Sequence, residues 1–227
     1  MKKVIYVEGE AELVFVYQLI ITHYQYQGTL FYLQTVNLNQ RSGVQLASHY
    51  GNVNAPDYFQ LVCVGGDTRV VSKLSEDYDR LINEDFDVIV GLRDIYSEAY
   101  TSIAGHNMDL GVVHQLIEGQ RGVLKPFPKV SLCFSIMEVE AWIIGMYPFL
   151  KRKYPGIGLG HICDPQKECV HPFNELKCAL NRMGVSFNKH WRDFISIMDQ
   201  ITREDFEELY SSPCCLSFNE FYDKVFS

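Results

Sequence analysis

Short apolar runs alternate with segments of helical periodicity through the first two thirds of the chain. The runs predict strands at residues 3–7, 29–36, 59–64, 87–92 and 130–136. Several of them are nearly continuous in apolar residues, which is typical of strands that are covered on both faces. Strands that alternate with helices in this way predict an α/β fold with a mostly parallel central sheet flanked by helices.

Two segments between these strands have the apolar spacing of helices. Residues 11–26 are apolar around most of the helix circumference, so we expect a buried crossover helix. Apolar and charged positions separate onto two faces between Val70 and Ile82, which predicts an amphipathic surface helix. Residues 37–58, by contrast, are rich in Asn, Gly and Ser and predict a loop or a short helix with long connections.

The character of the chain changes after residue 138. A helix is expected over residues 139–150, and the Pro- and Gly-rich residues 155–160 then interrupt the pattern. Further helical patterns occur near residues 172–183, 188–199, 203–211 and 217–226. We therefore expect an α/β core over residues 1–150 and an all-helical extension over residues 151–227 that docks on the core.

Composition limits the classes of partner. The chain has 227 residues, of which 47% are hydrophobic and 21% charged, and this is enough to bury a core. Its 20 Lys and Arg against 28 Asp and Glu give a net charge of −8, which argues against a protein that coats nucleic acid by electrostatics alone. A carboxylate metal site is compatible with this charge, because bound cations reverse the local sign where a phosphate binds.

The sequence has no pattern typical of secretion or of a membrane span. The apolar stretch at the N-terminus is short and is interrupted by Glu8. No window approaches the ~18 consecutive apolar residues that a transmembrane helix needs. Seven cysteines, an odd number, are typical of reduced thiols. We therefore expect a cytoplasmic protein without a membrane partner.

Acidic residues follow three of the predicted strands. They are Glu8, Glu10 and Glu12 after the first strand, Asp94 after the fourth, and Glu138 and Glu140 after the fifth. Ligands of open α/β sheets bind outside the carboxyl ends of the strands. Mg²⁺ prefers carboxylate oxygens together with water and substrate phosphate. The pattern therefore predicts a divalent-metal site at this edge of the sheet.

The same acids have a structural alternative. Glu10 and Glu12 can complement the positive end of the helix that follows them, and Glu138 and Glu140 can do the same for theirs. Residues two apart on a helix lie on nearly opposite faces. We therefore expect at most one of Glu138 and Glu140 to enter a shared site.

Other residues near the strand ends have two interpretations each. The backbone amides of Gly65 and Gly66 can cradle a phosphate at the start of the next helix. Alternatively, Asp67 or Thr68 is simply the cap of that helix. Arg93 can contact a scissile phosphate or pair with a nearby acid.

Two further groups of residues bear on ligands. Zinc accepts His and Cys, and four such residues lie close together in the sequence, namely His161, Cys163, Cys169 and His171. Their spacing differs from that of the usual zinc knuckle, so zinc is not expected there. Five scattered basic residues could together line a groove for DNA, namely Lys125, Lys129, Arg182, Lys189 and Arg192.

Four short motifs occur in an order that resembles a known family. They are VEGEAELVFV at residues 7–16, VGGD at 64–67, LRDIY at 92–96 and MEVEAW at 137–142. Together they resemble TOPRIM domains, in particular the branch that contains the overcoming-lysogenization-defect (OLD) nucleases and small TOPRIM-like proteins of unknown function. The resemblance spans almost the whole chain and implies a TOPRIM-like α/β core with a helical end.

The resemblance implies phosphodiester chemistry that depends on Mg²⁺ or Mn²⁺. In such enzymes the acids at the positions of Glu8 and Asp94 ligate metal, and the OLD-like branch adds an acid at the position of Glu12. Related branches favour Glu140 over Glu138 as an extra ligand. The residue at the position of Glu8 can instead serve as a general acid or base.

Two departures from the family pattern leave the activity open. Asp94 is followed by Ile95 and Tyr96, so the second metal-binding aspartate of the Asp-x-Asp motif is absent, and Met137 replaces the family's His. Two functions are consistent with this. The first is a divalent-metal-dependent nuclease acting on DNA or RNA, with Tyr96 as a secondary site candidate. The second is a catalytically inactive TOPRIM-like module that binds nucleic acid or a protein.

The resemblance also implies partners. OLD-like TOPRIM modules work with ATPases in bacterial defence, and this chain lacks a phosphate-binding loop of the Gly-x-x-x-x-Gly-Lys-Ser/Thr type. Any ATPase must therefore be a separate chain. A homo-oligomer is left open, as is a third interpretation as a zinc-stabilised interaction protein.

Overall fold

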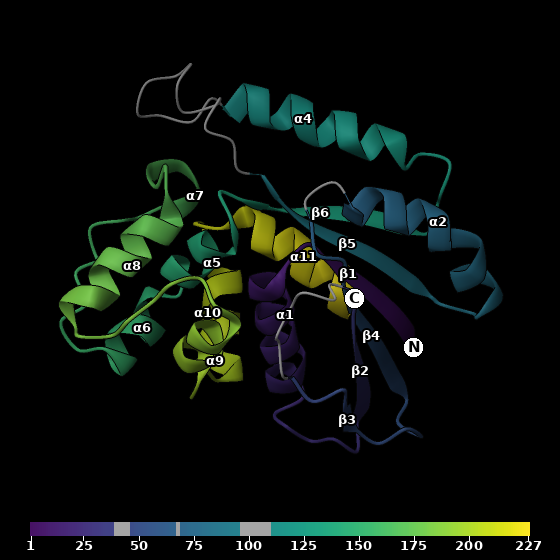
Figure 1. Cartoon of the computed structure of the whole chain (residues 1–227), viewed down its shortest axis with the longest axis horizontal. Coiled ribbons are helices and arrows are strands. Elements are labelled where there is room, and N and C mark those ends of the chain that lie inside the picture. The colour runs from purple at the N-terminus through teal and green to yellow at the C-terminus, as the bar shows by residue number, and fades with distance from the viewer. Residues whose placement is uncertain (39–45, 67–68, 96–109) are drawn as a thin grey trace.

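A computed structural model describes residues 1–38, 46–66, 69–95 and 110–227. These residues form a six-stranded sheet with helices on both faces (Figure 1). The strands are β1 (Lys2–Val7), β2 (Phe31–Asn37), β3 (His49–Gly51), β4 (Asp57–Cys63), β5 (Val88–Ile95) and β6 (Val130–Ile136). Their spatial order is β3-β2-β4-β1-β5-β6, and every neighbouring pair is parallel except β2 with β3. The predicted α/β class and mostly parallel sheet are confirmed.

Helices cover both faces of the sheet, which explains the apolar strands. They include α1 (Glu10–His23) and α11 (Leu216–Phe226) on one face, and α2 (Arg69–Asn83) and α4 (Leu110–Val123) on the other. Side chains of β1 alternate between the two hydrophobic clusters. Ile5 and Val7 pack in the cluster that contains α1 and α11, whereas Val4 and Tyr6 pack in the cluster that contains α2.

The segment expected to be a loop over residues 37–58 contains a short strand, so that prediction was wrong in part. β3 pairs antiparallel with β2, and Tyr32 lies opposite Gly51. Three largely exposed residues are too few to give a periodic signal. Gly51 has φ +89°, and a Cβ there would lie 2.1 Å from the carbonyl oxygen of Phe31, so only glycine fits. Residues 39–45 lie outside the described residues.

Two helices differ from the expected pattern. α4 was not expected between β5 and β6, because three glycines and several polar residues interrupt its apolar spacing. The helix expected over residues 139–150 is instead two helices, α5 (Val139–Gly145) and α6 (Tyr147–Lys153). Pro148 lies in the first turn of α6, where a helix tolerates a residue without an N–H. Because it has no N–H to donate, Pro148 cannot continue the hydrogen bonds of α5.

The elements of residues 151–227 are helices, which pack onto the α/β part. They include α7 (Pro165–Glu168), α8 (Pro172–Arg182), α9 (Trp191–Met198), α10 (Arg203–Ser211) and α11. α11 contacts β5 and β6, α9 and α10 contact α1, and α7 and α8 contact α5. These helices share one hydrophobic cluster with the sheet. Within the described ranges, no helix has the length and apolar composition needed to cross a membrane.

Trp142 of α5 lies in the middle of this shared core. Its ring centroid lies 5.4 Å from those of Phe15 in α1 and Phe218 in α11. Its indole Nε1 donates a hydrogen bond of 2.9 Å to the hydroxyl of Ser217. Aromatic contacts of this kind stabilise a core beyond the area that they bury. The helical end is therefore held to the α/β part through Trp142.

Lys3 ties the first strand to the last helix. The residue is 2% exposed, and its ammonium donates to the carbonyl oxygen of Val225 at 2.6 Å and lies 5.5 Å from the ring centroid of Phe59. Burial lowers the pKa of Lys3, against the charges of Asp57 and Asp87, which raise it. A cation is favourable at this place because the end of a helix carries partial negative charge.

Replacing Trp142 with Ala tests whether the two parts share one core. The substitution removes the largest fully buried side chain, so we expect the free energy of unfolding to fall by about 3–5 kcal/mol. Urea unfolding, followed by circular dichroism and by the fluorescence of the remaining Trp191, should give one coincident transition. The control Leu216→Ala, at an exposed position, should change stability by less than about 0.5 kcal/mol. Two separate transitions would contradict a shared core.

Candidate active site

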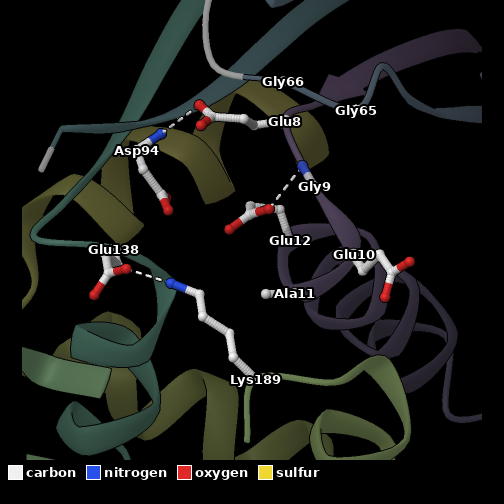
Figure 2. A pocket seen from close by; sticks show the side chains of 10 residues that line it. All are labelled: Glu8, Gly9, Glu10, Ala11, Glu12, Gly65, Gly66, Asp94, Glu138 and Lys189. Atoms are coloured by element: carbon white, nitrogen blue, oxygen red, sulfur yellow. Dashed lines mark hydrogen bonds and ion pairs between the residues drawn. The ribbon is translucent and has the colours of Figure 1, made fainter. Parts of the chain in front are cut away.

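A pocket of about 430 Å³ opens at the carboxyl ends of the parallel strands (Figure 2). It is lined by Glu8, Gly9, Glu10, Ala11, Glu12, Gly65, Gly66, Asp94, Glu138 and Lys189. These residues follow β1, β4 and β6, lie near the end of β5, or precede α9. Since β1 lies between β4 and β5, its end is at the middle of this edge, where ligands of open α/β sheets bind.

Glu8 leaves the end of β1 and is held at both its side chain and its backbone. Its Oε2 accepts a hydrogen bond from the backbone N–H of Asp94, with an N···O distance of 3.3 Å. Its carbonyl oxygen accepts the N–H groups of Gly65 at 2.9 Å and Gly66 at 3.1 Å. The side chain is 12% exposed, so the carboxylate lies at the pocket with little freedom to reorient.

The same contacts decide the role of the two glycines. Gly65 and Gly66 line the pocket, but the carbonyl of Glu8 accepts both of their N–H groups. The phosphate cradle expected from these amides is therefore not formed as predicted. The alternative caps, Asp67 and Thr68, lie outside the described residues.

Glu12 lies in the first turn of α1 and faces the pocket. Its Oε2 accepts the N–H of Gly9 at 2.8 Å, and Gly9 is the N-cap of the helix in an extended conformation. A Cβ on Gly9 would lie 3.0 Å from this oxygen, so glycine leaves room for the contact. Glu12 thus complements the helix N-terminus and lines the pocket at once. Glu10 points away from the other acids (Figure 2).

Asp94 lies near the end of β5, opposite Ser135 of β6. The Ser135 hydroxyl donates a hydrogen bond to Asp94 Oδ1. Burial raises the pKa of Asp94 well above its usual range. The charges of Glu12, Glu140 and Glu8 raise it further, in that order of size. These carboxyl groups are therefore close enough to affect one another's ionisation.

Lys189 joins the two acids that follow β6. Its Nζ forms an ion pair with Glu138 Oε1 and lies 3.3 Å from Glu140 Oε1. Both acids contact the same ammonium, but only one of them lines the pocket, so the expectation that at most one enters a shared site stays a prediction. Glu138 precedes α5 with φ +75°, so the helical spacing that separates positions two apart does not apply. Glu138 lines the pocket, and Glu140 is fully buried.

Few contacts offset the free-energy cost of burying the Glu140 carboxylate. Burial raises its pKa to about 8, against the nearby charge of Lys189, which lowers it, while Glu138 and Glu12 add to the rise. Neither carboxylate oxygen has a hydrogen-bond partner in the described part of the chain. A buried carboxylate in this condition needs a proton or a cation to offset its lost hydration.

Lys189 is the site residue that the sequence did not reveal. It was expected only among scattered basic residues, and no motif or periodicity marks it. Burial lowers the pKa of Lys189, but the charges of Glu140 and Glu138 outweigh this effect and raise it. The pKa values of both Lys189 and Glu140 are raised, because the lysine faces several acids whereas Glu140 faces a single ammonium. The lysine therefore keeps its charge more readily than Glu140 keeps its own.

Arg93 pairs with a nearby acid, which is one of the two roles predicted for it. Its Nη1 donates to the side chain of Gln120 in α4, and its Nε lies 3.9 Å from Glu8 Oε2. Arg93 does not line the pocket. In this arrangement it pairs with an acid instead of facing a phosphate. Tyr96 lies outside the described residues.

The donor set suits a hard divalent cation. The oxygens come from Glu8, Glu12, Asp94 and Glu140. A divalent ion would relieve the repulsion among these acids and would give Glu140 a closer cation than the ammonium that now lies 3.3 Å from its Oε1. Over the described ranges, however, no three His, Cys, Asp or Glu side chains are close enough to hold one ion. The carboxylates would therefore have to draw closer around a metal.

The residues of the two other groups considered from the sequence do not form one site with this pocket. The described residues contain no metal-binding group at 161–171, where Cys163 is exposed and Cys169 is buried. Lys125 lines a pocket near the amino end of β6, whereas Lys189 lies at the carboxyl ends of the strands. These two lysines are thus at opposite edges of the sheet and do not belong to one groove.

Raising the pH should destabilise the protein when a chelator removes divalent ions. The pKa of Glu140 is about 8 in the folded state and near 4.5 otherwise. Between these values the folded state holds the extra proton, so stability falls as the pH rises. We expect the free energy of unfolding to fall by about 1–2 kcal/mol between about pH 6.5 and 8.5.

Urea unfolding at several pH values measures this dependence. Glu140→Gln should have a smaller slope than the wild type, because an amide has no proton to release. Glu10→Gln is the matched control, since its side chain points away from the other acids, and it should keep the wild-type slope. An unchanged slope in Glu140→Gln would contradict the raised pKa.

Comparisons with known proteins identify no relative of this chain. The chain matches no protein-family model, no curated protein and no solved structure. The resemblance to TOPRIM domains therefore rests on the four motifs and on their order along the chain. Function is inferred from the chemistry of the side chains that these motifs contribute to the pocket.

Proposed function

We propose that the protein is a divalent-metal-dependent nuclease of the TOPRIM type, which hydrolyses phosphodiester bonds in DNA or RNA. One observation carries the proposal. Four carboxylates at the ends of three strands or just after them, namely Glu8, Glu12, Asp94 and Glu140, interact at the carboxyl edge of a parallel sheet beside an open pocket. Metal-dependent nucleases use acids grouped in this way to bind their ions. The order of the motifs supports the TOPRIM assignment.

The ligands of Mg²⁺ or Mn²⁺ would be Glu8, Glu12, Asp94 and Glu140. When bound, such an ion polarises a phosphoryl oxygen and lowers the pKa of a water molecule. Other groups of the chain orient the ligands. The Ser135 hydroxyl holds Asp94, the N–H of Gly9 holds Glu12, and the N–H of Asp94 holds Glu8. These hydrogen bonds fix the direction in which each carboxylate faces.

A catalytically inactive TOPRIM-like binding module is the second candidate, and one observation favours it. The Lys189 ammonium pairs with Glu138 and Glu140, where a metal ion would otherwise find its oxygens. Tyr96 also replaces the second aspartate of the Asp-x-Asp motif. In this case the pocket would bind nucleic acid or a protein without cleaving it.

The resemblance extends the proposal to partners and to location. It supports an effector of bacterial defence that works in the cytoplasm beside a separate ATPase. The acids at the strand ends bear on metal and phosphate chemistry alone. The ATPase, the defence role, the cytoplasmic location and a homo-oligomer therefore stay predictions.

Asp94→Asn should abolish cleavage of plasmid, single-stranded DNA or RNA in Mg²⁺ or Mn²⁺. Loss of the central carboxylate removes a ligand, so we expect the rate to fall at least about a hundredfold. Glu8→Gln should behave in the same way, and Glu10→Gln should retain the wild-type rate. Cleavage that survives in both Asp94→Ala and Glu8→Ala would show that these acids are not the active site. Metal binding without cleavage in the wild type would favour the binding module.

Ser135→Ala tests the orientation of Asp94. Without the hydroxyl that donates to Asp94, we expect the affinity for Mn²⁺ to fall about 10–100-fold. Isothermal titration calorimetry measures the affinity. Ser131→Ala removes a hydroxyl from the amino end of the same strand and should leave the affinity unchanged. Equal affinities in the two variants would show that Ser135 does not position the ligand.

A further inference from the structure

Lys189 brings a positive charge from the helical end of the chain into the acidic site (Figure 2). Its Nζ pairs with Glu138 and lies 3.3 Å from Glu140 Oε1. Among the described residues that line the pocket, Lys189 is the only cation. One monovalent charge thus faces a group of carboxylates that would suit a divalent ion.

The backbone around Lys189 holds it in this position. Lys189 has φ +60°, a conformation that residues other than glycine rarely adopt. The N–H of Asn188 donates to Asp193 Oδ2 at 2.8 Å. His190 caps α9 by accepting the N–H of Arg192 at 3.3 Å. Anchors on both sides therefore fix the backbone from which the lysine side chain reaches the site.

The two acids differ in how well they tolerate loss of the lysine. Glu140 is fully buried, and its oxygens have no hydrogen-bond partner in the described chain. Glu138 lines the pocket and is 13% exposed, so water reaches it. The side chain of Lys189 is 36% exposed and can retreat toward solvent while it stays near Glu138. An ammonium at 3.3 Å repels any divalent ion that approaches Glu140.

We propose that Lys189 is the resident counter-cation of this site, and that a divalent ion binds Glu140 by replacing its ammonium, which stays paired with Glu138. The inference rests on the proposed function, because it takes Glu140 as a metal ligand. It gives Glu138 a role, which is to hold the displaced lysine. It also makes metal binding depend on the helical end of the chain.

Titration of Mn²⁺ into the full-length protein after chelator treatment tests the exchange. Lys189→Met removes the competing charge, so we expect Mn²⁺ to bind about tenfold or more tightly than to the wild type. Lys189→Arg keeps the charge and should bind with wild-type affinity. Lys167→Met removes an exposed lysine that pairs with Asp164, and it should also match the wild type.

Thermal melting gives a second readout. In chelator, Lys189→Met should melt at a lower temperature than the wild type, because the buried Glu140 loses its nearest positive charge. Mn²⁺ should then raise the melting temperature of this variant by more than that of the wild type. If Lys189→Met does not fold, the double variant Lys189→Met/Glu138→Gln, which loses one charge of each sign, carries the same test.

Each outcome decides between the two proposals. Tighter Mn²⁺ binding without Lys189, including binding where the wild type has none, supports the exchange. Equal or weaker binding overturns it and leaves the nuclease proposal standing, since the lysine then acts elsewhere in the reaction or only in folding. No Mn²⁺ binding in any variant overturns both the exchange and the metal-dependent function.

Discussion

The parallel pairing of β1 with β4 on one side and β5 on the other is the constraint on which the site depends. Val7 lies opposite both Cys63 and Leu92, so the three strands reach the same edge of the sheet together. Glu8 and Asp94 are then neighbours through the geometry of the sheet, before any side-chain contact forms. Backbone hydrogen bonds to the carbonyl of Glu8 continue the pairing one step beyond the strands.

Several unfavourable features occur together at this edge of the sheet. Burial raises the pKa of Asp94, Glu12 and Glu140, and repulsion from nearby acids adds to the rise for Asp94 and Glu140, which opposes folding at neutral pH. Glu138 and Lys189 both have left-handed backbone conformations. The apolar core supplies the free energy that offsets these costs. Such a local conflict is expected where residues serve a function other than folding.

The sequence was informative where its signal was local. Strands buried on both faces need continuous apolar runs, so β1, β4, β5 and β6 were predicted, and the positions of Glu8 and Asp94 followed from them. β3 was missed because its three residues are largely exposed. Tertiary contacts decided the rest. The amides of Gly65 and Gly66 donate to the carbonyl of Glu8, and Lys189 reaches the acids only through the packing of the helical end of the chain.

The position of α11 affects the order in which the protein is completed during translation. A ribosome releases β5 and β6 long before α11, so Leu92 and Cys133 belong to a hydrophobic cluster that stays open until the last helix is made. Lys3 likewise cannot form its hydrogen bond until the carbonyl of Val225 has been synthesised. Lys189 emerges after every acid of the pocket. A nascent chain that has not reached α11 therefore lacks one side of this cluster, and one that has not reached residue 189 has a pocket whose described lining carries acids without a cation.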